Sequence, residues 1–194
     1  MAGGVTFGGW LGMAALWQAM MTLMMAPTAY PWLRAAGRIG GGEVGAPAAS
    51  FGLGYFVAWV PFSLALAAAQ MGLASRLATP DWRGGLLLAA GLYQFMPLKR
   101  ACLRHCRNPL GSLLERWESG PPALWRMGAE HGLVCLGCCW ALMATALGVG
   151  MANVAWMAAL AAATFAEQTL PRTAWLRTAL GVGLVAAGGA LLLL

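Results

Sequence analysis

Long apolar stretches alternate with short polar segments along the whole chain. An α-helix needs about 20 residues to cross a bilayer, and six of these stretches are close to that length or longer. They lie at residues 7–31, 51–75, 84–101, 128–147, 151–167 and 175–194. The fourth and fifth share one uncharged run, which the turn signal Gly148-Val149-Gly150 divides. The pattern predicts an all-α protein, a polytopic membrane helix bundle with six transmembrane helices that forms a single integral membrane domain over residues 1–194.

A shorter amphipathic pattern covers residues 109–118, between the third and fourth stretches. Asn108 and Pro109 are typical of a helix start, because asparagine caps the first turn and proline fits the first helical position. Apolar side chains recur on one face of this helix at Leu110, Leu113, Leu114 and Trp117. We expect a short interfacial helix that lies either on the membrane surface or against the rest of the protein.

The composition favours a membrane protein. Of the 194 residues, 60% are hydrophobic and 9% are charged, whereas soluble domains have about 25% charged residues. So few charges cannot cover a soluble domain of this size, which argues against a soluble enzyme, a disordered chain or a fibre. The net charge of +6 does not indicate a nucleic acid partner, because the basic residues lie between the apolar stretches. The expected partner is the lipid bilayer.

The basic residues also orient the predicted bundle. With six spans, ten of the twelve Lys and Arg residues fall on one side: Arg34, Arg38, Lys99, Arg100, Arg104, Arg107, Arg116, Arg126, Arg172 and Arg177. Arg76 and Arg83 fall on the other side. Cytoplasmic loops carry the excess of basic residues, so the pattern predicts that the ten are cytoplasmic and that both termini lie outside.

The candidate chemistry is concentrated in one segment. It contains all five cysteines and both histidines of the chain, at Cys102, His105, Cys106, His131, Cys135, Cys138 and Cys139. On helices, residues 102, 105 and 106 share one face and residues 131, 135 and 138 share another. If the third and fourth spans are antiparallel, the two faces meet near their cytoplasmic ends. Thiolate and imidazole ligands together suit copper or zinc.

Sulfur-containing residues also have a purely structural interpretation. Cysteine is small and apolar, and it packs in membrane helices without any ligand. In the first stretch one helix face carries Met13, Trp17, Met20 and Met24, and Met21 and Met25 lie beside it. These thioethers could pass a soft ion along the helix, or they could serve as flexible packing.

Two glutamates and the paired glycines can also be interpreted either as functional or as purely structural. Glu130 and Glu167 could orient a histidine ligand as carboxylates outside the metal shell, or they could be ordinary interfacial charges. Glycines four residues apart, such as Gly128 and Gly132, allow helices to approach closely. With 27 glycines in the chain such pairs arise easily, so the spacing is weak evidence.

Motifs spread over nearly the whole chain carry a family resemblance. They comprise residues 92–110, residues 131–142 with Gly137-Cys-Cys-Trp140, and shorter segments at residues 24–27, 54–59 and 151–157. In these residues the chain resembles the DUF2182 family of bacterial integral membrane proteins, which are described as predicted metal-binding. The resemblance implies ligands at Cys102, Cys106, His131, Cys135, Cys138 and Cys139, and His105 also fits the motif. Gln168 departs from it, since relatives often have lysine at that position.

We therefore expect a multi-pass protein of the bacterial inner membrane that binds a soft transition metal, copper before zinc, for handling or delivery. Seven ligands exceed the four of one tetrahedral ion, so two sites, or one site with spare ligands for transfer, would be needed. We do not expect an enzyme. The sequence has no paired carboxylates, no Ser-His-Asp order and no phosphate-binding glycine loop.

Two alternatives stay open at this point. The chain could be an accessory or assembly subunit of a larger membrane complex whose cysteines bind nothing. His105 or His131 could instead ligate a haem or pigment, although the sequence has no Cys-x-x-Cys-His attachment motif.

Overall fold

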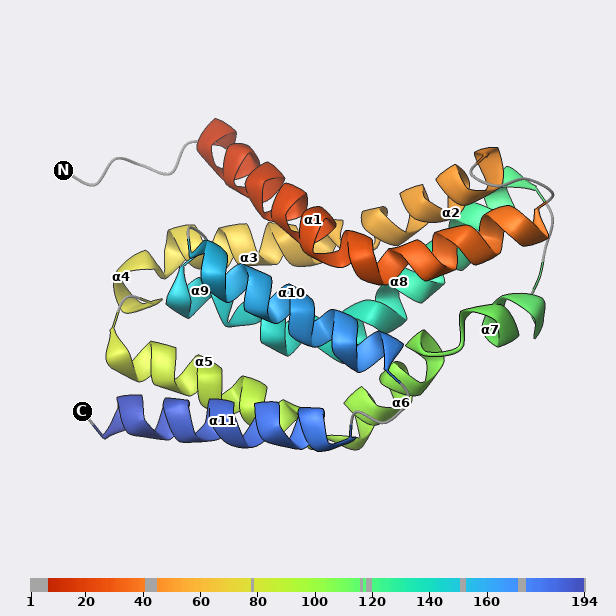
Figure 1. The fold of residues 1–194 in the computed structure, drawn as a ribbon. Helices are drawn as coiled ribbons and strands as arrows, with labels where there is room; N and C mark the ends of the chain where they lie inside the picture. The colour runs from red at the N-terminus through yellow and green to blue at the C-terminus, as the bar shows by residue number, and fades with distance from the viewer. Residues whose placement is uncertain are drawn as a thin grey trace.

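The computed structural model describes residues 7–40, 45–77, 79–115, 117, 120–150, 153–170 and 174–193. These residues form helices and connecting turns without a strand, so the predicted all-α class is confirmed. The helices, drawn in Figure 1, are α1 (Phe7–Ile39), α2 (Ala46–Val57), α3 (Val60–Gly72), α4 (Ala74–Leu77), α5 (Pro80–Tyr93), α6 (Pro97–Cys106), α7 (Pro109–Glu115), α8 (Pro121–Ala144), α9 (Ala146–Val149), α10 (Val154–Thr169) and α11 (Ala174–Leu192).

Local signals in the sequence determine where helices begin and end. In α2, α3, α5, α6 and α8 a proline occupies one of the first two helical positions, where its missing N–H costs no hydrogen bond. Asn108 caps α7, because its Oδ1 accepts a hydrogen bond from the Gly111 N–H at 3.2 Å. The predicted turn is also present. Helix α9 ends at Val149, and Gly150 has a φ of 100°, which favours glycine.

Fewer helices can cross a membrane than the sequence predicts. Within the described residues, three segments are long and apolar enough: Ala46–Gly72 (α2 and α3), Pro121–Val149 (α8 and α9) and Ala174–Leu192 (α11). The prediction of six spans is therefore wrong. Helices α5 and α10 have 14 and 16 residues, fewer than the about 20 that a bilayer needs. Helix α1 has 33 residues, but glycine, glutamine, threonine and tryptophan interrupt its apolar run.

This correction also affects the predicted orientation. An even number of spans places both termini on the same side, so the expectation that both lie outside loses its basis when three segments qualify. Two of the basic residues that supported it, Arg116 and Arg172, lie outside the described residues.

The third predicted span is divided into two helices. The stretch 84–101 is interrupted because α5 ends at Tyr93 and α6 begins at Pro97. The residue before a proline avoids the helical conformation, and Met96 is accordingly extended, with φ and ψ of −65° and 143°. Apolar length alone does not reveal such a break.

Two other predicted boundaries also move. The stretch 128–147 starts earlier than predicted, since α8 begins at Pro121. The stretch 151–167 is matched by α10, which covers Val154–Thr169, and residues 151 and 152 lie outside the described residues. In both cases the helix continues through residues that are less apolar than the predicted stretch.

The predicted interfacial helix is shorter than its sequence pattern. Helix α7 ends at Glu115, and residues 116, 118 and 119 lie outside the described residues. Leu113 is buried against side chains of α1, α2 and α8, whereas Leu110 and Leu114 are exposed. The helix therefore packs on the protein through one leucine and leaves the other two on the surface.

Helix α8 lies at the centre of the bundle, where it contacts α2, α5, α6 and α10 (Figure 1). Its contact with α2 is made through glycines. A Cβ atom at Gly54 would lie 1.9 Å from the backbone oxygen of Trp125, and one at Gly128 would lie 2.0 Å from that of Phe51. No side chain fits in either place, so the backbones of the two helices touch, as small residues allow.

A buried ion pair joins α6 to α10. Lys99 and Glu167 are 0% and 2% exposed, and Lys99 Nζ lies 2.7 Å from Glu167 Oε2. Lys99 also donates a hydrogen bond to the Gln94 side chain, and Arg107 Nε donates one to the Glu167 backbone oxygen at 2.8 Å. Glu167 therefore neutralises a lysine instead of orienting a histidine, and it fixes the end of α10 against α6.

We expect Gly128→Ala to destabilise the bundle, because its methyl group would overlap the Phe51 carbonyl. Overpacking of this kind costs about 1–3 kcal/mol, which thermal unfolding in detergent would measure as a lower Tm. Gly12→Ala is the matched control, since nothing lies within 4 Å of a Cβ atom at that position. An unchanged Tm for Gly128→Ala would contradict the direct contact between the two backbones.

Lys99→Met should destabilise the protein by about 3–5 kcal/mol, because it leaves the buried Glu167 carboxylate without its partner. Arg126→Gln is the control. Its Nε lies 3.7 Å from Glu130 Oε1 in a pair whose side chains are 58% and 53% exposed, and such pairs contribute about 0.3–0.5 kcal/mol. Equal changes in the free energy of unfolding for the two variants would show that the buried pair has no special role.

Candidate metal centre

Three of the predicted ligands meet in the core of the bundle. The Sγ atoms of Cys106, Cys135 and Cys138 lie within 4.8 Å of one another, and all three residues are buried. Cys106 is the last residue of α6, whereas Cys135 and Cys138 lie three residues apart on one face of α8. We call these three cysteines the thiol triad.

The spacing of the thiol triad fits a single metal ion. Metal–thiolate bonds are about 2.3 Å long, so two sulfurs on the same ion lie at most about 4.6 Å apart. Every cysteine of the chain is a free thiol in the structure, so none is consumed by a disulfide. Thiolate-rich sites favour Cu(I), zinc or iron–sulfur clusters. The triad can therefore hold a soft ion after small side-chain movements.

Two polar side chains contact the sulfurs of the thiol triad. The Tyr55 hydroxyl is hydrogen-bonded to Cys135 Sγ at 3.1 Å. The Gln168 amide donates from Nε2 to the sulfurs of Cys135 and Cys138, both at 3.5 Å. Donors of this kind stabilise negative charge on a thiolate and orient it. Sequence reasoning missed Gln168 as a site residue, because it lies far from the cysteines in sequence and an amide is not an expected metal ligand.

Metal binding at this site would be coupled to the release of a proton. Hydrogen bonds to Cys135 and Cys138, followed by burial, raise the pKa of the Cys106 thiol. Cys106 therefore keeps its proton at neutral pH while the site holds no metal. Because a thiol must lose its proton to become a ligand, metal affinity is expected to increase as the pH rises.

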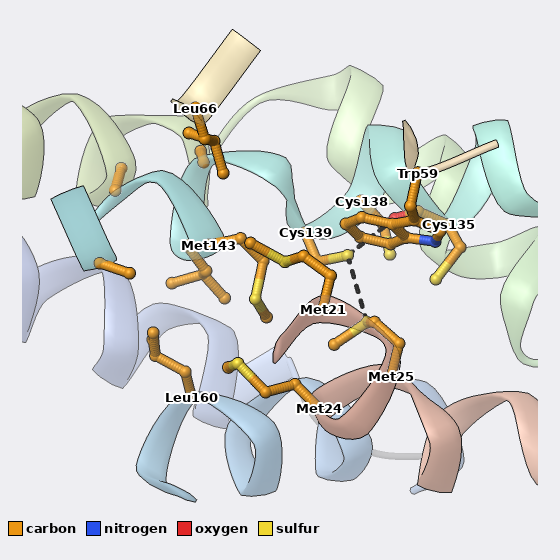
Figure 2. Close-up of a cluster of buried hydrophobic side chains, with 14 of the residues drawn as sticks. Met21, Met24, Met25, Trp59, Leu66, Cys135, Cys138, Cys139, Met143 and Leu160 are labelled. Atoms are coloured by element: carbon orange, nitrogen blue, oxygen red, sulfur yellow. Dashed lines mark hydrogen bonds between the residues drawn. The ribbon is translucent and has the colours of Figure 1, made fainter. Parts of the chain in front are cut away.

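Cys139 lies between the thiol triad and the methionines of α1. Its Sγ donates a hydrogen bond to the Cys135 backbone oxygen at 2.9 Å and lies 4.0 Å from Met25 Sδ (Figure 2). Met21 and Met24 are buried in the same layer. Of the predicted methionine face only Met24 lies in this layer, together with the neighbouring Met21 and Met25, and a role in passing ions stays a prediction.

Cys102 is separate from the other cysteines. It is half-buried, and its Sγ lies against Gly137, 3.0 Å from the place that a Cβ atom would occupy there. The sequence placed Cys102 and Cys106 on one helix face. In the structure that face is wide enough for Cys106 to join the thiol triad while Cys102 does not.

The two histidines form a separate aromatic cluster. The His131 ring stacks on Trp32 at a centroid distance of 3.6 Å, and the rings of His105 and His131 are 5.8 Å apart. Tyr55 also stacks on His131, at 5.4 Å, and Trp32 Nε1 donates a hydrogen bond to the Cys106 backbone oxygen at 3.2 Å. The structure thus divides the seven predicted ligands into the thiol triad, the pair of histidines, and two cysteines outside the triad, Cys102 and Cys139.

A family model described as PpoB2, copper chaperone, matches residues 14–191, which is nearly the whole chain. The family found is therefore not DUF2182, and that assignment is corrected: it rested on separate short motifs, whereas this match extends through the chain as one model. No curated protein and no solved structure matches the chain.

Replacing the amide that contacts the sulfurs should weaken metal binding. We expect Gln168→Leu to lower the Cu(I) affinity about 10–100-fold, the usual effect of removing a partner of a ligand. Gln70→Leu is the control, because the Gln70 amide accepts a hydrogen bond from Trp17 and contacts no cysteine of the triad. Competition with a Cu(I) chelator measures both affinities. Equal affinities in the two variants would remove Gln168 from the site.

Proposed function

This chain belongs to the PpoB2 copper chaperone family, and from that premise we propose that it carries Cu(I) on the thiol triad. The observation on which the proposal depends is the convergence of three buried thiols from two helices. Cys106, Cys135 and Cys138 would be the ligands, and Tyr55 and Gln168 would hold the two α8 sulfurs in position.

Copper is favoured over zinc by the number and kind of ligands. Structural zinc sites have four protein ligands in a tetrahedron, whereas the triad offers three sulfurs, and in the described chain no fourth His, Cys, Asp or Glu ligand lies within 4.8 Å of all three. Thiolates are soft ligands and select Cu(I). A site with three ligands also leaves one side of the ion open, as transfer to another protein requires.

We place the protein in the bacterial inner membrane. The three candidate spans support this location, and the window of Ala174–Leu192 is only 17% buried inside the structure. An apolar surface of that size needs either lipid or a partner protein to cover it. Because Pro121–Val149 contains Cys135 and Cys138, the copper site would lie on a membrane helix.

The proposed role is delivery of copper and not catalysis. A protein that receives the ion would be the partner, and this role includes the accessory-subunit alternative if that partner is a membrane complex. Haem ligation is not favoured, because the cavity beside the two histidines has a volume of about 70 Å³, far smaller than a porphyrin.

Elemental analysis after Cu(I) loading tests the proposal. The protein, recovered from the membrane fraction with detergent, should bind one equivalent, and Cys135→Ser or Cys138→Ser should reduce bound copper to background. Cys102→Ser is the matched control and should retain the ion, because Cys102 lies outside the thiol triad. Copper at background in the wild-type protein, or unchanged in Cys135→Ser, would refute copper binding by the triad.

A further inference from the structure

Side chains from α1, α2, α6, α7 and α8 line a cavity of about 70 Å³. His105 and His131, the two histidines of the chain, both line it, together with Trp32 and Glu130. None of its lining residues is a cysteine. A water molecule needs about 10–15 Å³ of such volume, so the cavity has room for an ion or a few waters.

One buried polar atom at this cavity has no partner. His131 is 3% exposed, and its Nδ1 makes no hydrogen bond to any residue that the structure describes. The large majority of buried side-chain polar atoms are paired, and a bound ion or water is one explanation of an exception. A bound ion or water next to the imidazole would therefore satisfy the unpaired Nδ1 of His131.

A second imidazole lies beside that of His131. The rings of His105 and His131 have centroids 5.8 Å apart and planes inclined by 35°. Metal–imidazole bonds are about 2.0–2.1 Å long, so the separation of the rings is compatible with one ion bound by a nitrogen from each. Neutral imidazole is a common ligand of copper, and two nitrogen ligands suffice for Cu(I).

Two further side chains form part of the cavity wall. Trp32 stacks on the His131 ring at a centroid distance of 3.6 Å, which holds the imidazole in place at the wall of the cavity. Glu130 also lines the cavity; its side chain is 53% exposed, and its Oε1 lies 3.7 Å from Arg126 Nε. An ion in the cavity would therefore lie beside imidazole and carboxylate groups, with no thiol among the lining residues.

The histidines of the cavity and the cysteines of the thiol triad occupy neighbouring positions on the same two helices. His131 precedes Cys135 by one turn of α8, a rise of about 5–6 Å, and His105 is the neighbour of Cys106 at the end of α6. Trp32 joins the two places, since it stacks on His131 and donates a hydrogen bond to the Cys106 backbone oxygen.

We propose that this cavity is the entry site for copper, where His105 and His131 bind Cu(I) before it passes to the thiol triad. This inference rests on the proposed function. The step is a ligand exchange without a change of oxidation state: the copper–nitrogen bonds break, copper–sulfur bonds to Cys106, Cys135 and Cys138 form, and thiol protons are released to water. The imidazoles then return to the metal-free state.

The rate of copper loading tests the entry site. His131→Phe removes both nitrogens but keeps an aromatic ring against Trp32, and Ser112→Ala is the control in the same cavity. Both variants keep the thiol triad, so both should take up one equivalent of Cu(I). Loading from a Cu(I)–bicinchoninate complex, followed by the absorbance of the chelate, should be at least tenfold slower in His131→Phe and unchanged in Ser112→Ala.

The outcomes separate this inference from the proposed function. Equal loading rates in His131→Phe and the wild-type protein would overturn the entry site and leave copper binding by the triad intact. If the wild-type protein takes up no Cu(I), the proposed function fails and the entry site fails with it. His105→Phe provides the same test of the second imidazole if His131→Phe does not fold.

X-ray absorption spectroscopy tests the histidine site in a variant that lacks the thiol triad. In a variant with Cys106→Ser, Cys135→Ser and Cys138→Ser, X-ray absorption of the protein after exposure to Cu(I) should show scattering from imidazole, at an affinity at least tenfold below that of the wild type. Adding His105→Phe should remove this signal. Copper bound without imidazole scattering, or no bound copper because the cavity holds water alone, would overturn the proposal.

Discussion

Because Gly54 and Gly128 have no side chains, the backbones of α2 and α8 touch, and this contact sets the distance at which their neighbouring side chains pack. Tyr55 follows Gly54 on α2, and as a result its ring lies on His131 while its hydroxyl reaches Cys135. A larger residue at either glycine would separate the helices and withdraw Tyr55 from both. The positions of the histidine cluster and of the thiol triad thus both depend on the close contact between α2 and α8.

Much of the local structure is determined by short-range signals and could be predicted. The Asn108 cap and the break at Gly150 depend on the residue itself and its neighbours. The number of spans was not predictable by counting apolar residues. Pro97 divides one apolar stretch, which follows from a rule on the residue before proline, and α10 is too short to cross a bilayer on its own.

The candidate site could be predicted only as far as single helices determine it. The spacing of Cys135 and Cys138 on α8 places both sulfurs on one face. Which residue of α6 meets them depends on how α6 packs, and that is fixed by the buried pair of Lys99 with Glu167. The same pair brings the adjacent Gln168 onto the sulfurs. Contacts between segments so distant in sequence have no signature in the local pattern.

The thiol triad also has a mechanical consequence. Cys106 lies on α6 and its two partners lie on α8, so an ion shared by them would tie together two points about thirty residues apart. Closing such a loop restricts the unfolded chain much as a disulfide does, and a ligand that binds only the folded state stabilises it further. Copper would therefore act as a removable cross-link, and the protein would become looser each time it gives up its cargo.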